Sequence, residues 1–255
     1  MQNALLVGLS RQVVLRRELD VVANNIANVN TAGFKADGAV FEEFIGRIAR
    51  SDNMSNRDRQ VSFVRDRATW TDFSQGSMER TGNATDVAID GKGLFAVQTP
   101  AGERYTRNGG FQIDNTGQLV TSEGFPVLGE NGPIQFQPND VNIQISGDGT
   151  ISVAVAGNPG QESQRGKLRM VGIDNPAMLQ KVGQGTFALK DGANIVPDTQ
   201  SKFVQGSVEK SNVRSVVEMT RMIEITRTYT QVANMMQQQS DMRRATIDKL
   251  AEVPA

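Results

Sequence analysis

Apolar side chains recur at helical spacing along the first thirty residues of the chain. They are Leu5, Leu9, Val13, Leu19, Val22 and Ile26. Such spacing places apolar groups along one side of a helix and polar groups along the other. The pattern predicts an amphipathic helix over about residues 4–28, roughly 37 Å long. We assign residues 1–30 to this N-terminal helical segment.

Residues 31–74 lose this periodicity, and we expect an extended connector there. From 75 to 205 the pattern changes to short alternating runs that glycine turns interrupt. The Asp148-Gly149 pair, for example, stands between two runs in which Ile and Val alternate with polar residues, as at a hairpin turn. We therefore predict a central antiparallel β-rich domain over 75–205. Whether 141–190 forms an inserted subdomain is left open.

The pattern becomes helical again in the C-terminal segment, 206–255, and predicts a helix over 212–250. A helix of that length measures about 57 Å, longer than the predicted β domain could cover. Its apolar residues follow two adjacent coiled-coil seams. One seam contains Met222, Ile225, Tyr229, Val232 and Met236, and the other contains Val216, Met219, Ile223 and Ala233. Two seams indicate two kinds of neighbour: the N-terminal helix of the same chain and the helices of other subunits.

The predicted fold class is therefore α+β. Long N- and C-terminal helices form a coiled-coil layer, and the antiparallel β-rich domain lies between them in the sequence. A lone subunit would leave the apolar stripes of both helices in water, so we expect them to order on contact with partners.

Asparagines gather at the end of the first predicted helix, although asparagine is a poor helix former, roughly 0.6 kcal/mol worse than alanine. Asn24, Asn25 and Asn28 lie close together on the helix surface. A polar residue at a packed position penalises every helix register that leaves it unpaired. We hypothesise that these residues hydrogen-bond to neighbouring helices and set the axial register between subunits. The alternative is that they face solvent at a fraying helix end.

Composition removes many kinds of chemistry. The chain of 255 residues contains no cysteine and no histidine, and its formal charge is -1. Thiolate nucleophiles, Cys/His zinc sites, Ser-His-Asp triads and imidazole acid–base catalysis are therefore excluded. The near-neutral charge gives no general attraction to nucleic acid. No apolar run approaches the roughly 20 residues of a membrane span, and the N-terminus does not resemble a cleaved signal peptide.

The remaining enzyme-like motifs are weak. Ser207 and Lys210 match an S-x-x-K pattern, but its companion elements are missing. Asp86 and Asp90 could suggest a glycosidase, yet in a strand they would stand about 13 Å apart, beyond the reach of paired carboxylates. Residues 47–67 hold six arginines and three aspartates; a solvated segment is favoured over an acidic partner or a cell-wall polymer, and its role stays open. We expect no enzymatic activity, no cofactor, no metal and no small-molecule substrate.

Several stretches together resemble the flagellar basal-body rod and hook protein family. They are LDVVANNIANVNTAGFK (19–35), TGNATDVAIDGKGLFAV (81–97), YTRNGGF (105–111), GQLVTSEGFPVLG (117–129), IDNP (173–176) and QGSVEKSNV (205–213). The resemblance covers nearly the whole chain, and the N-terminus is more similar to proximal rod members than to distal rod or hook members. The Arg-rich connector matches no family pattern.

The resemblance implies a structural subunit of the proximal rod, the axial drive shaft that crosses the periplasm, transmits motor torque and serves motility. It implies export by the flagellar type III apparatus without cleavage, and self-assembly with other rod subunits and with copies of itself through the terminal helices. The alternatives are a distal rod or hook subunit of the same family, a peptidoglycan-acting enzyme on the rod, or a soluble coiled-coil adaptor that forms a small oligomer.

The expected assembly interface combines the seams with the asparagines. It comprises Leu5, Leu9, Val13, Leu19, Val22, Asn24, Asn25, Ile26, Asn28, Val216, Met219, Met222, Ile223, Ile225, Tyr229, Val232, Ala233 and Met236.

Overall fold

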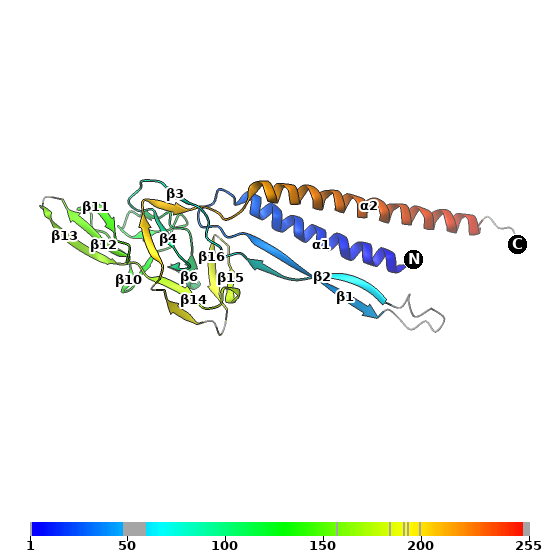
Figure 1. Ribbon diagram of the computed structural model, residues 1–255, viewed down its shortest axis with the longest axis horizontal. Helices are drawn as coiled ribbons and strands as arrows, with labels where there is room; N and C mark the ends of the chain where they lie inside the picture. Colours follow the sequence, from blue (N-terminus) through cyan, green and yellow to red (C-terminus); the bar gives the residue numbers. More distant parts are fainter. Residues whose placement is uncertain are drawn as a thin grey trace. The chain divides into compact units, whose positions relative to one another are not determined.

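The computed structural model describes residues 2–47, 60–156, 158–183, 185–190, 192, 194–198 and 200–251; the side-chain surroundings of 2–5, 41–68, 158–161, 250 and 251 lie outside this description. The fold is α+β, with a helix at each end of the sequence and a β-rich central region (Figure 1). This part of the expectation is confirmed. The chain divides into two compact units: unit 1 is Met1–Ala27, Asp37–Trp70 and Arg214–Ala255, and unit 2 is Asn28–Ala36 and Thr71–Val213.

Unit 1 contains the two helices, α1 (Gln2–Ala27) and α2 (Ser215–Ala251). They correspond to the predicted helices at 4–28 and 212–250, with ends that differ by one to three residues. No glycine or proline lies within α2, which explains why the helix runs without interruption.

Unit 1 also contains two paired strands, β1 (Asp37–Arg47) and β2 (Gln60–Thr71). The sequence predicted only an extended connector over 31–74 and did not predict this pairing. The residues of this segment show no regular alternation of apolar and polar positions, which is the signal by which a strand is recognised from sequence, so the pairing was missed. The Arg-rich stretch at 47–67 falls largely outside the described residues.

Unit 2 is built from short strands, and the pairs with a recorded register are all antiparallel. A six-stranded sheet has the order β15-β16-β6-β5-β14-β17, and β11, β12 and β13 form a three-stranded sheet. The strands are β3 (Met78–Arg80), β4 (Val87–Asp90), β5 (Leu94–Thr99), β6 (Gly102–Thr106), β7 (Gln112–Ile113), β8 (Leu119–Val120), β9 (Leu128–Gly129), β10 (Gly132–Pro133), β11 (Asp140–Ile145), β12 (Thr150–Val155), β13 (Asn158–Lys167), β14 (Met170–Ile173), β15 (Leu179–Lys181), β16 (Thr186–Leu189), β17 (Ile195–Pro197), β18 (Lys202–Gln205) and β19 (Ser207–Glu209), with a short 3₁₀ helix η1 (Pro176–Met178).

The Asp148-Gly149 turn behaves as the sequence predicted. It joins β11 to β12, which pair antiparallel with Ile145 opposite Ile151. Gly149 has a φ of 89°, and a Cβ there would lie 2.6 Å from the ring of Phe203. Glycine is thus required for both the backbone conformation and the close approach.

Two apolar clusters form the core of unit 2. The larger includes Phe95, Phe111 and Phe203, whose rings pack around Phe95 at centroid distances of 4.9 and 5.8 Å. The smaller includes Tyr105 and Phe187 on the six-stranded sheet. Because this core is contributed by strands throughout 87–203, unit 2 has a hydrophobic core of its own.

Candidate assembly site

The two helices of unit 1 pack against each other in antiparallel fashion (Figure 1). Gly8, near the start of α1, faces Met236, whereas Glu18, later in α1, pairs with Arg221 at 2.8 Å. A Cβ on Gly8 would lie 3.0 Å from the side chain of Met236. The missing side chain therefore gives the methionine its space.

The contact between the helices uses the first of the two predicted seams. Leu15, Val22 and Ile225 are fully buried at its centre. Partly buried side chains surround them: Leu19, Ile26, Met222, Tyr229 and Val232. The contact within the chain thus uses residues of the predicted interface, and their role between subunits stays a prediction. Leu15 was not among the predicted residues.

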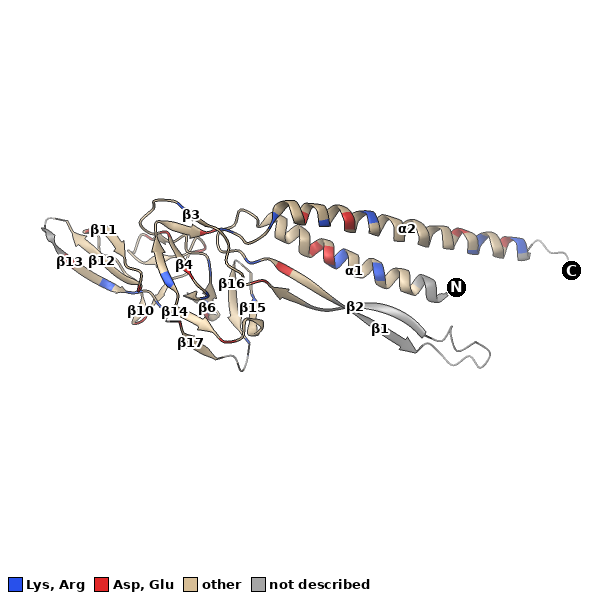
Figure 2. Ribbon diagram, viewed as in Figure 1, with Lys and Arg blue, Asp and Glu red and all other residues tan. Residues whose placement is uncertain are grey.

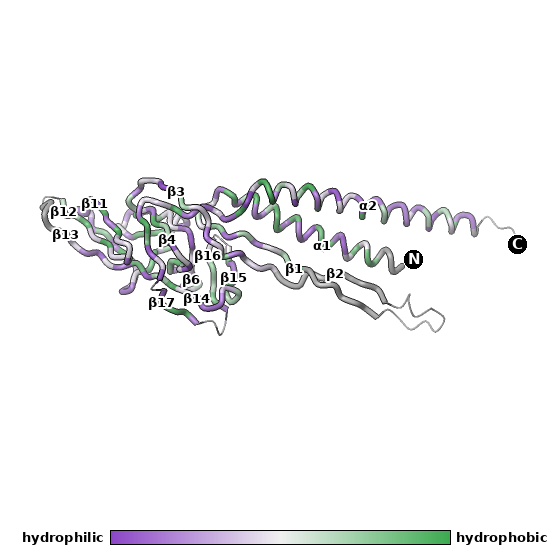
Figure 3. The backbone as a smooth tube through the Cα atoms, in the orientation of Figure 1, coloured by the Kyte–Doolittle hydropathy of each residue, from purple (hydrophilic) through white to green (hydrophobic). Residues whose placement is uncertain are grey.

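The second predicted seam of α2 has no partner of comparable kind within the described part of the chain. Val216 is 72% exposed, Met219 48% and Ile223 53%. Ala233 is half-buried. Apolar residues therefore line α2 on a side that α1 leaves open, and Figure 3 shows hydrophobic positions alternating with hydrophilic ones along this helix.

The N-terminal half of α1 has an open apolar side as well. Leu6, Leu9 and Val13 are 47%, 51% and 62% exposed. The side-chain surroundings of Leu5 lie outside the described residues. Val14 and Val21, which the sequence did not single out, are buried, and α1 also contacts β1 in this unit.

A groove of about 510 Å³ follows the open side of α2. Met222, Ile223, Thr226, Arg227, Thr230 and Gln231 line it. The walls are chiefly apolar and the charge along α2 is mixed, with basic and acidic residues interspersed (Figure 2). Such a surface fits an apolar helix stripe better than a strongly charged partner.

The asparagines divide among three environments. Asn25 is buried, and its side chain holds the backbone of Asp37: the amide nitrogen donates to the Asp37 carbonyl at 2.8 Å, and the amide oxygen accepts from the Asp37 N–H at 2.9 Å. The Asn25 nitrogen also donates to a carboxylate oxygen of Glu218 in α2 at 3.4 Å, so Asn25 bonds to a neighbouring helix, the one in its own chain. The hypothesis that the asparagines set register between subunits stays a prediction. Asn24 is exposed, and Asn28 accepts a hydrogen bond from the Thr31 hydroxyl at 3.2 Å.

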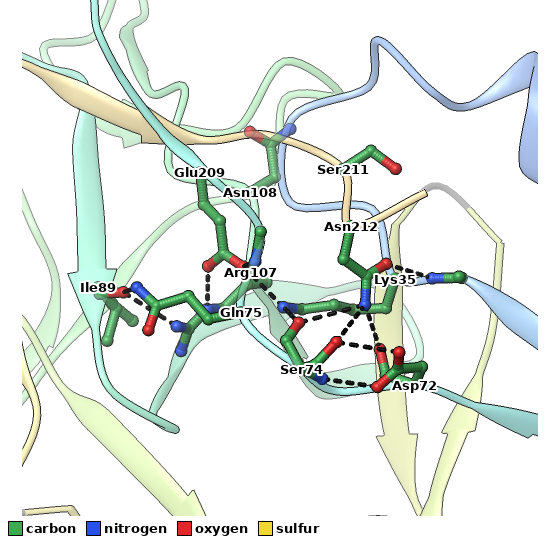
Figure 4. Close-up of polar contacts among 12 residues, drawn as sticks. Lys35, Asp72, Ser74, Gln75, Ile89, Arg107, Asn108, Glu209, Ser211 and Asn212 are labelled. Carbon is green, nitrogen blue, oxygen red and sulfur yellow. Dashed lines mark hydrogen bonds and ion pairs between the residues drawn. The ribbon is translucent and has the colours of Figure 1, made fainter. Parts of the chain in front are cut away.

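Unit 2 contains a feature that the sequence analysis missed, a buried charge cluster of Lys35, Arg107 and Glu209 (Figure 4). Lys35 donates to one carboxylate oxygen of Glu209 at 2.6 Å, and Arg107 donates through Nε to the other. The N–H of Gly76 also donates to Glu209, at 2.8 Å. A single carboxylate therefore serves two cations and a backbone donor.

Backbone carbonyls satisfy the remaining donors of the two cations. Lys35 donates to the carbonyl of Ser74 at 2.7 Å. The guanidinium of Arg107 donates to the carbonyls of Ile89, Gly91 and Gly93. Burial lowers the pKa of Lys35 from its ordinary value, and the charge of Arg107 acts in the same direction, whereas Glu209 opposes the shift. The cluster carries a net positive charge within the protein interior.

Asn212 extends this network toward the chain segments on both sides of the β1–β2 pair. Its side-chain oxygen accepts from the N–H of Ala36 at 2.7 Å. Its nitrogen donates to the carbonyl of Asp72 at 2.8 Å and to that of Ser74 at 3.2 Å (Figure 4). One amide thus holds together residues that are far apart in the sequence.

The carboxylate of Asp86, considered above for catalysis, serves a turn. It accepts hydrogen bonds from the Thr81 hydroxyl at 2.6 Å and from Asn83 at 3.0 Å. Across the described residues, no three carboxylates come together in a way that could hold a metal ion. None of the described helices is both long and apolar enough to cross a membrane.

Three family models match the chain. The model described as "Flagella basal body rod protein" matches residues 5–35, "Flagellar hook protein FlgE/F/G D1 domain" matches 88–153, and "Flagellar basal body rod FlgEFG protein C-terminal" matches 204–249. Flagellar basal-body rod protein FlgF of Caulobacter vibrioides is 38% identical over 99% of this chain and 100% of its own length. The chain belongs to the flagellar basal-body rod protein family.

Other relatives agree with this assignment. FlgF of Mesorhizobium japonicum is 34% identical, with 93% of each chain covered. FlgG of Bacillus subtilis is 34% identical over 88% of this chain and 89% of its own. The family resemblance inferred from the sequence is thus confirmed. The 38% identity over the full length of a FlgF protein, against 34% identity over 88% of this chain for the FlgG example, favours the FlgF type.

The buried charge cluster combines one residue from each segment that the rod-family models match. Lys35 lies at the end of the first segment, Arg107 within the second and Glu209 within the third. Three stretches that carried the sequence resemblance, NTAGFK, YTRNGGF and QGSVEKSNV, therefore meet at one place in unit 2.

Proposed function

We propose that this chain is a structural subunit of the proximal flagellar basal-body rod, of the FlgF type, and that it assembles with other rod subunits through the open apolar sides of α1 and α2. Family membership and the full-length similarity to a FlgF protein support the rod assignment. The family is structural, so no enzymatic activity follows, and the basal body is the place of action.

One observation carries the assembly mode: the exposed second seam of α2. Val216, Met219 and Ile223 form an apolar stripe beside a groove, on a helix that already packs against α1 through its other side. Fully burying a side chain such as isoleucine contributes about 1.5–3 kcal/mol. A subunit therefore gains most when helices of other rod subunits, of this or a related chain, cover the stripe.

The partners and the export route are proposed on the basis of the same family assignment. The helical layer would be a coiled-coil tube formed by α1 and α2 of successive subunits within the periplasm. Export by the flagellar type III apparatus without a cleaved signal peptide, and ordering of the helices on contact with the growing tip, complete the proposal. The small α1–α2 core of three fully buried side chains supports late ordering.

Introducing a charge into the stripe tests the assembly surface. Ile223→Lys should weaken incorporation into rods about 10- to 100-fold, since it loses the burial of one large apolar side chain. Glu224→Lys is the matched control, because Glu224 is the next residue, is exposed and undergoes the larger change in charge. Rods isolated from cells and swimming in soft agar measure the outcome. Equal assembly of both variants would contradict the proposed surface.

Axial position is tested separately. A FlgF-type subunit should cross-link to proximal rod neighbours when cysteines are placed at exposed α2 positions such as Met219. A distal rod or hook subunit is the alternative, because the chain is also similar to a FlgG protein. Cross-links to distal rod or hook subunits alone would favour it. A peptidoglycan-acting enzyme would instead require turnover of the polymer by the purified chain.

A further inference from the structure

Two segments of unit 2 continue directly into the helices. We call residues 28–36, which follow α1, the N-lead, and residues 205–213, which precede α2, the C-lead. Lys35 belongs to the N-lead and Glu209 to the C-lead, so the buried charge cluster joins the two leads across 174 positions of sequence.

We propose that the buried charge cluster acts as a clamp that holds the N-lead and the C-lead against each other within unit 2. The clamp thereby keeps the end of α1 and the start of α2 close together before the helices are ordered. The proposal deepens the proposed function, because it rests on the late ordering of the helices. It assigns a conformational role to residues that the assembly surface does not use.

The leads are bonded to each other by backbone as well as by side chains. The N–H of Gly33 in the N-lead donates to the carbonyl of Glu209 at 2.7 Å. The N–H of Ala36 donates to the side chain of Asn212 in the C-lead at 2.7 Å. Together with the Lys35–Glu209 ion pair, these contacts fix the N-lead at three successive points.

The N-lead is also seated closely on the β fold. Gly33 has a φ of +67°, and a Cβ there would lie 2.3 Å from the backbone nitrogen of Asn108. The ammonium of Lys181, in β15, lies 3.6 Å from the ring centroid of the buried Phe34 and donates to the carbonyl of Lys35 at 3.1 Å. These contacts lie entirely within unit 2, so they require no order in the helices.

Clamping the leads shortens the effective loop that separates the helices. Ala27 and Ser215 are 188 positions apart in sequence, but Gly33 lies six residues after Ala27 and Glu209 lies six residues before Ser215. With unit 2 folded and the N-lead free, the chain after Ala27 is next held at Met78, which pairs with Glu209, so the helices are separated by a loop of about 57 residues. Fixing Gly33 against Glu209 shortens this loop to about 12 residues. Because loop-closure probability falls with about the 3/2 power of loop length, the local concentration of α1 around α2 should rise about tenfold. Pairing of α1 with α2 then begins from a prepared position.

Hydrogen exchange on the purified full-length chain tests the clamp. In the wild-type protein, the lead amides of Gly33, Ala36 and Lys210 should be protected to an extent comparable with the β5 core, while amides of α1 and α2 exchange rapidly. Lys35→Met should lower the protection of the N-lead about tenfold, because the two hydrogen bonds that the buried Lys35 ammonium donates to Ser74 and Glu209 are lost. It should lower the protection of the C-lead and of β5 by less than that, since Glu209 keeps its pair with Arg107.

Glu130→Gln is the control, since Glu130 makes an exposed ion pair with Lys167 in the same unit. Unchanged protection of the N-lead in Lys35→Met would overturn the clamp, and so would an equal loss in β5, because the cluster would then be an ordinary part of the core. Rapid exchange of the leads in the wild-type chain would overturn it as well. Protection of wild-type α1 and α2 equal to that of unit 2 would show that late ordering of the helices is wrong. In that case, leads that are protected in the wild type and lose protection in Lys35→Met would still establish the clamp.

Discussion

Replacing Glu209 by glutamine should destabilise unit 2 far more than its small chemical change suggests. Glutamine has nearly the same shape, but its side chain has one acceptor oxygen and one NH₂ group. The two carboxylate oxygens of Glu209 accept from Lys35 and Gly76 on one side and from Arg107 on the other. In either orientation of the amide, the NH₂ group therefore faces a donor.

The magnitude follows from the charges that remain. Removing one partner of a buried ion pair typically costs about 3–5 kcal/mol, because the other charge is left buried without compensation. Here Glu209→Gln leaves two buried cations, Lys35 and Arg107, so we expect the free energy of unfolding of unit 2 to fall by an amount near the upper end of that range. Glu130→Gln removes the same charge from an exposed pair and should change it by less than about 1 kcal/mol.

Lys35→Met provides the opposite perturbation in the same cluster. It removes a cation whose pKa burial lowers, and leaves Glu209 paired with Arg107. We therefore expect a loss of less than about 2 kcal/mol. The two variants also differ in pH dependence. The pKa of Lys35 in the folded protein lies below its ordinary value of 10.5, so the unfolded chain binds more protons in the interval between the two values. The free energy of unfolding of wild-type unit 2 should therefore rise with pH through that interval, and Lys35→Met should abolish this rise.

Hydrogen exchange of β5 amides at increasing urea concentration measures the opening of unit 2 separately from the helices. The expected order of stability is wild type and Glu130→Gln, then Lys35→Met, then Glu209→Gln. The reasoning is refuted if Lys35→Met and Glu209→Gln are equally destabilising, since the effect would then be a general response to substitution and not the loss of the single anion.

Two further substitutions test single contacts. Asn25→Asp should disturb the contact between α1 and β1, because a carboxylate cannot donate a hydrogen bond to the carbonyl of Asp37. We expect this variant to assemble into rods less well than Asn24→Asp, which changes the exposed neighbouring position. Equal assembly of the two variants would contradict the reasoning. Gly33→Ala should lower the melting temperature of unit 2, because a φ of +67° is unfavourable for alanine and the added Cβ would collide with the backbone of Asn108. A thermal scan measures the change. An unchanged melting temperature would contradict the close contact of the N-lead with Asn108.

The helices and the β-rich centre were predictable because their signals are local. Residues such as Ile225 and Tyr229 are spaced by the helix period itself, and Asp148-Gly149 signals a turn within a few residues. The two seams marked two apolar sides of α2 without indicating which of them meets α1. The structure makes that assignment: Ile225 is buried against α1, whereas Val216 and Ile223 are exposed.

The buried charge cluster could not be predicted in the same way. Glu209 lies 102 positions from Arg107 and 174 from Lys35, and no sequence period links them. Charged residues are usually exposed, so the ordinary expectation placed all three at the surface. Their only local signal was proximity to glycine in the motifs that carried the family resemblance. Gly33, for example, lets the N-lead approach the backbone of Asn108 closely.

Asn25 shows a different limit of sequence reasoning. The argument that a packed asparagine penalises wrong registers is sound, and Asn25 is indeed buried. Periodicity alone gave no way to identify its partner, because the partner is the backbone of Asp37, at the start of a strand that the sequence did not predict. A buried amide satisfies whichever backbone group comes within reach, and its partner depends on the fold of the connecting segment.

The two units differ in what they bury: unit 2 buries a cluster of charged side chains, whereas unit 1 leaves apolar side chains exposed. Unit 2 encloses Lys35, Arg107 and Glu209, and carbonyls and the one carboxylate satisfy the two cations, which requires the N-lead and C-lead to be in place. In unit 1, by contrast, α2 leaves Val216, Met219 and Ile223 in water. Polar networks tolerate little misplacement, whereas apolar surfaces gain from any well-fitting neighbour. A precise polar network at the leads, combined with open apolar sides on the helices, is what a subunit needs if unit 2 is to be complete before its partners arrive and the helices are to order on contact with them.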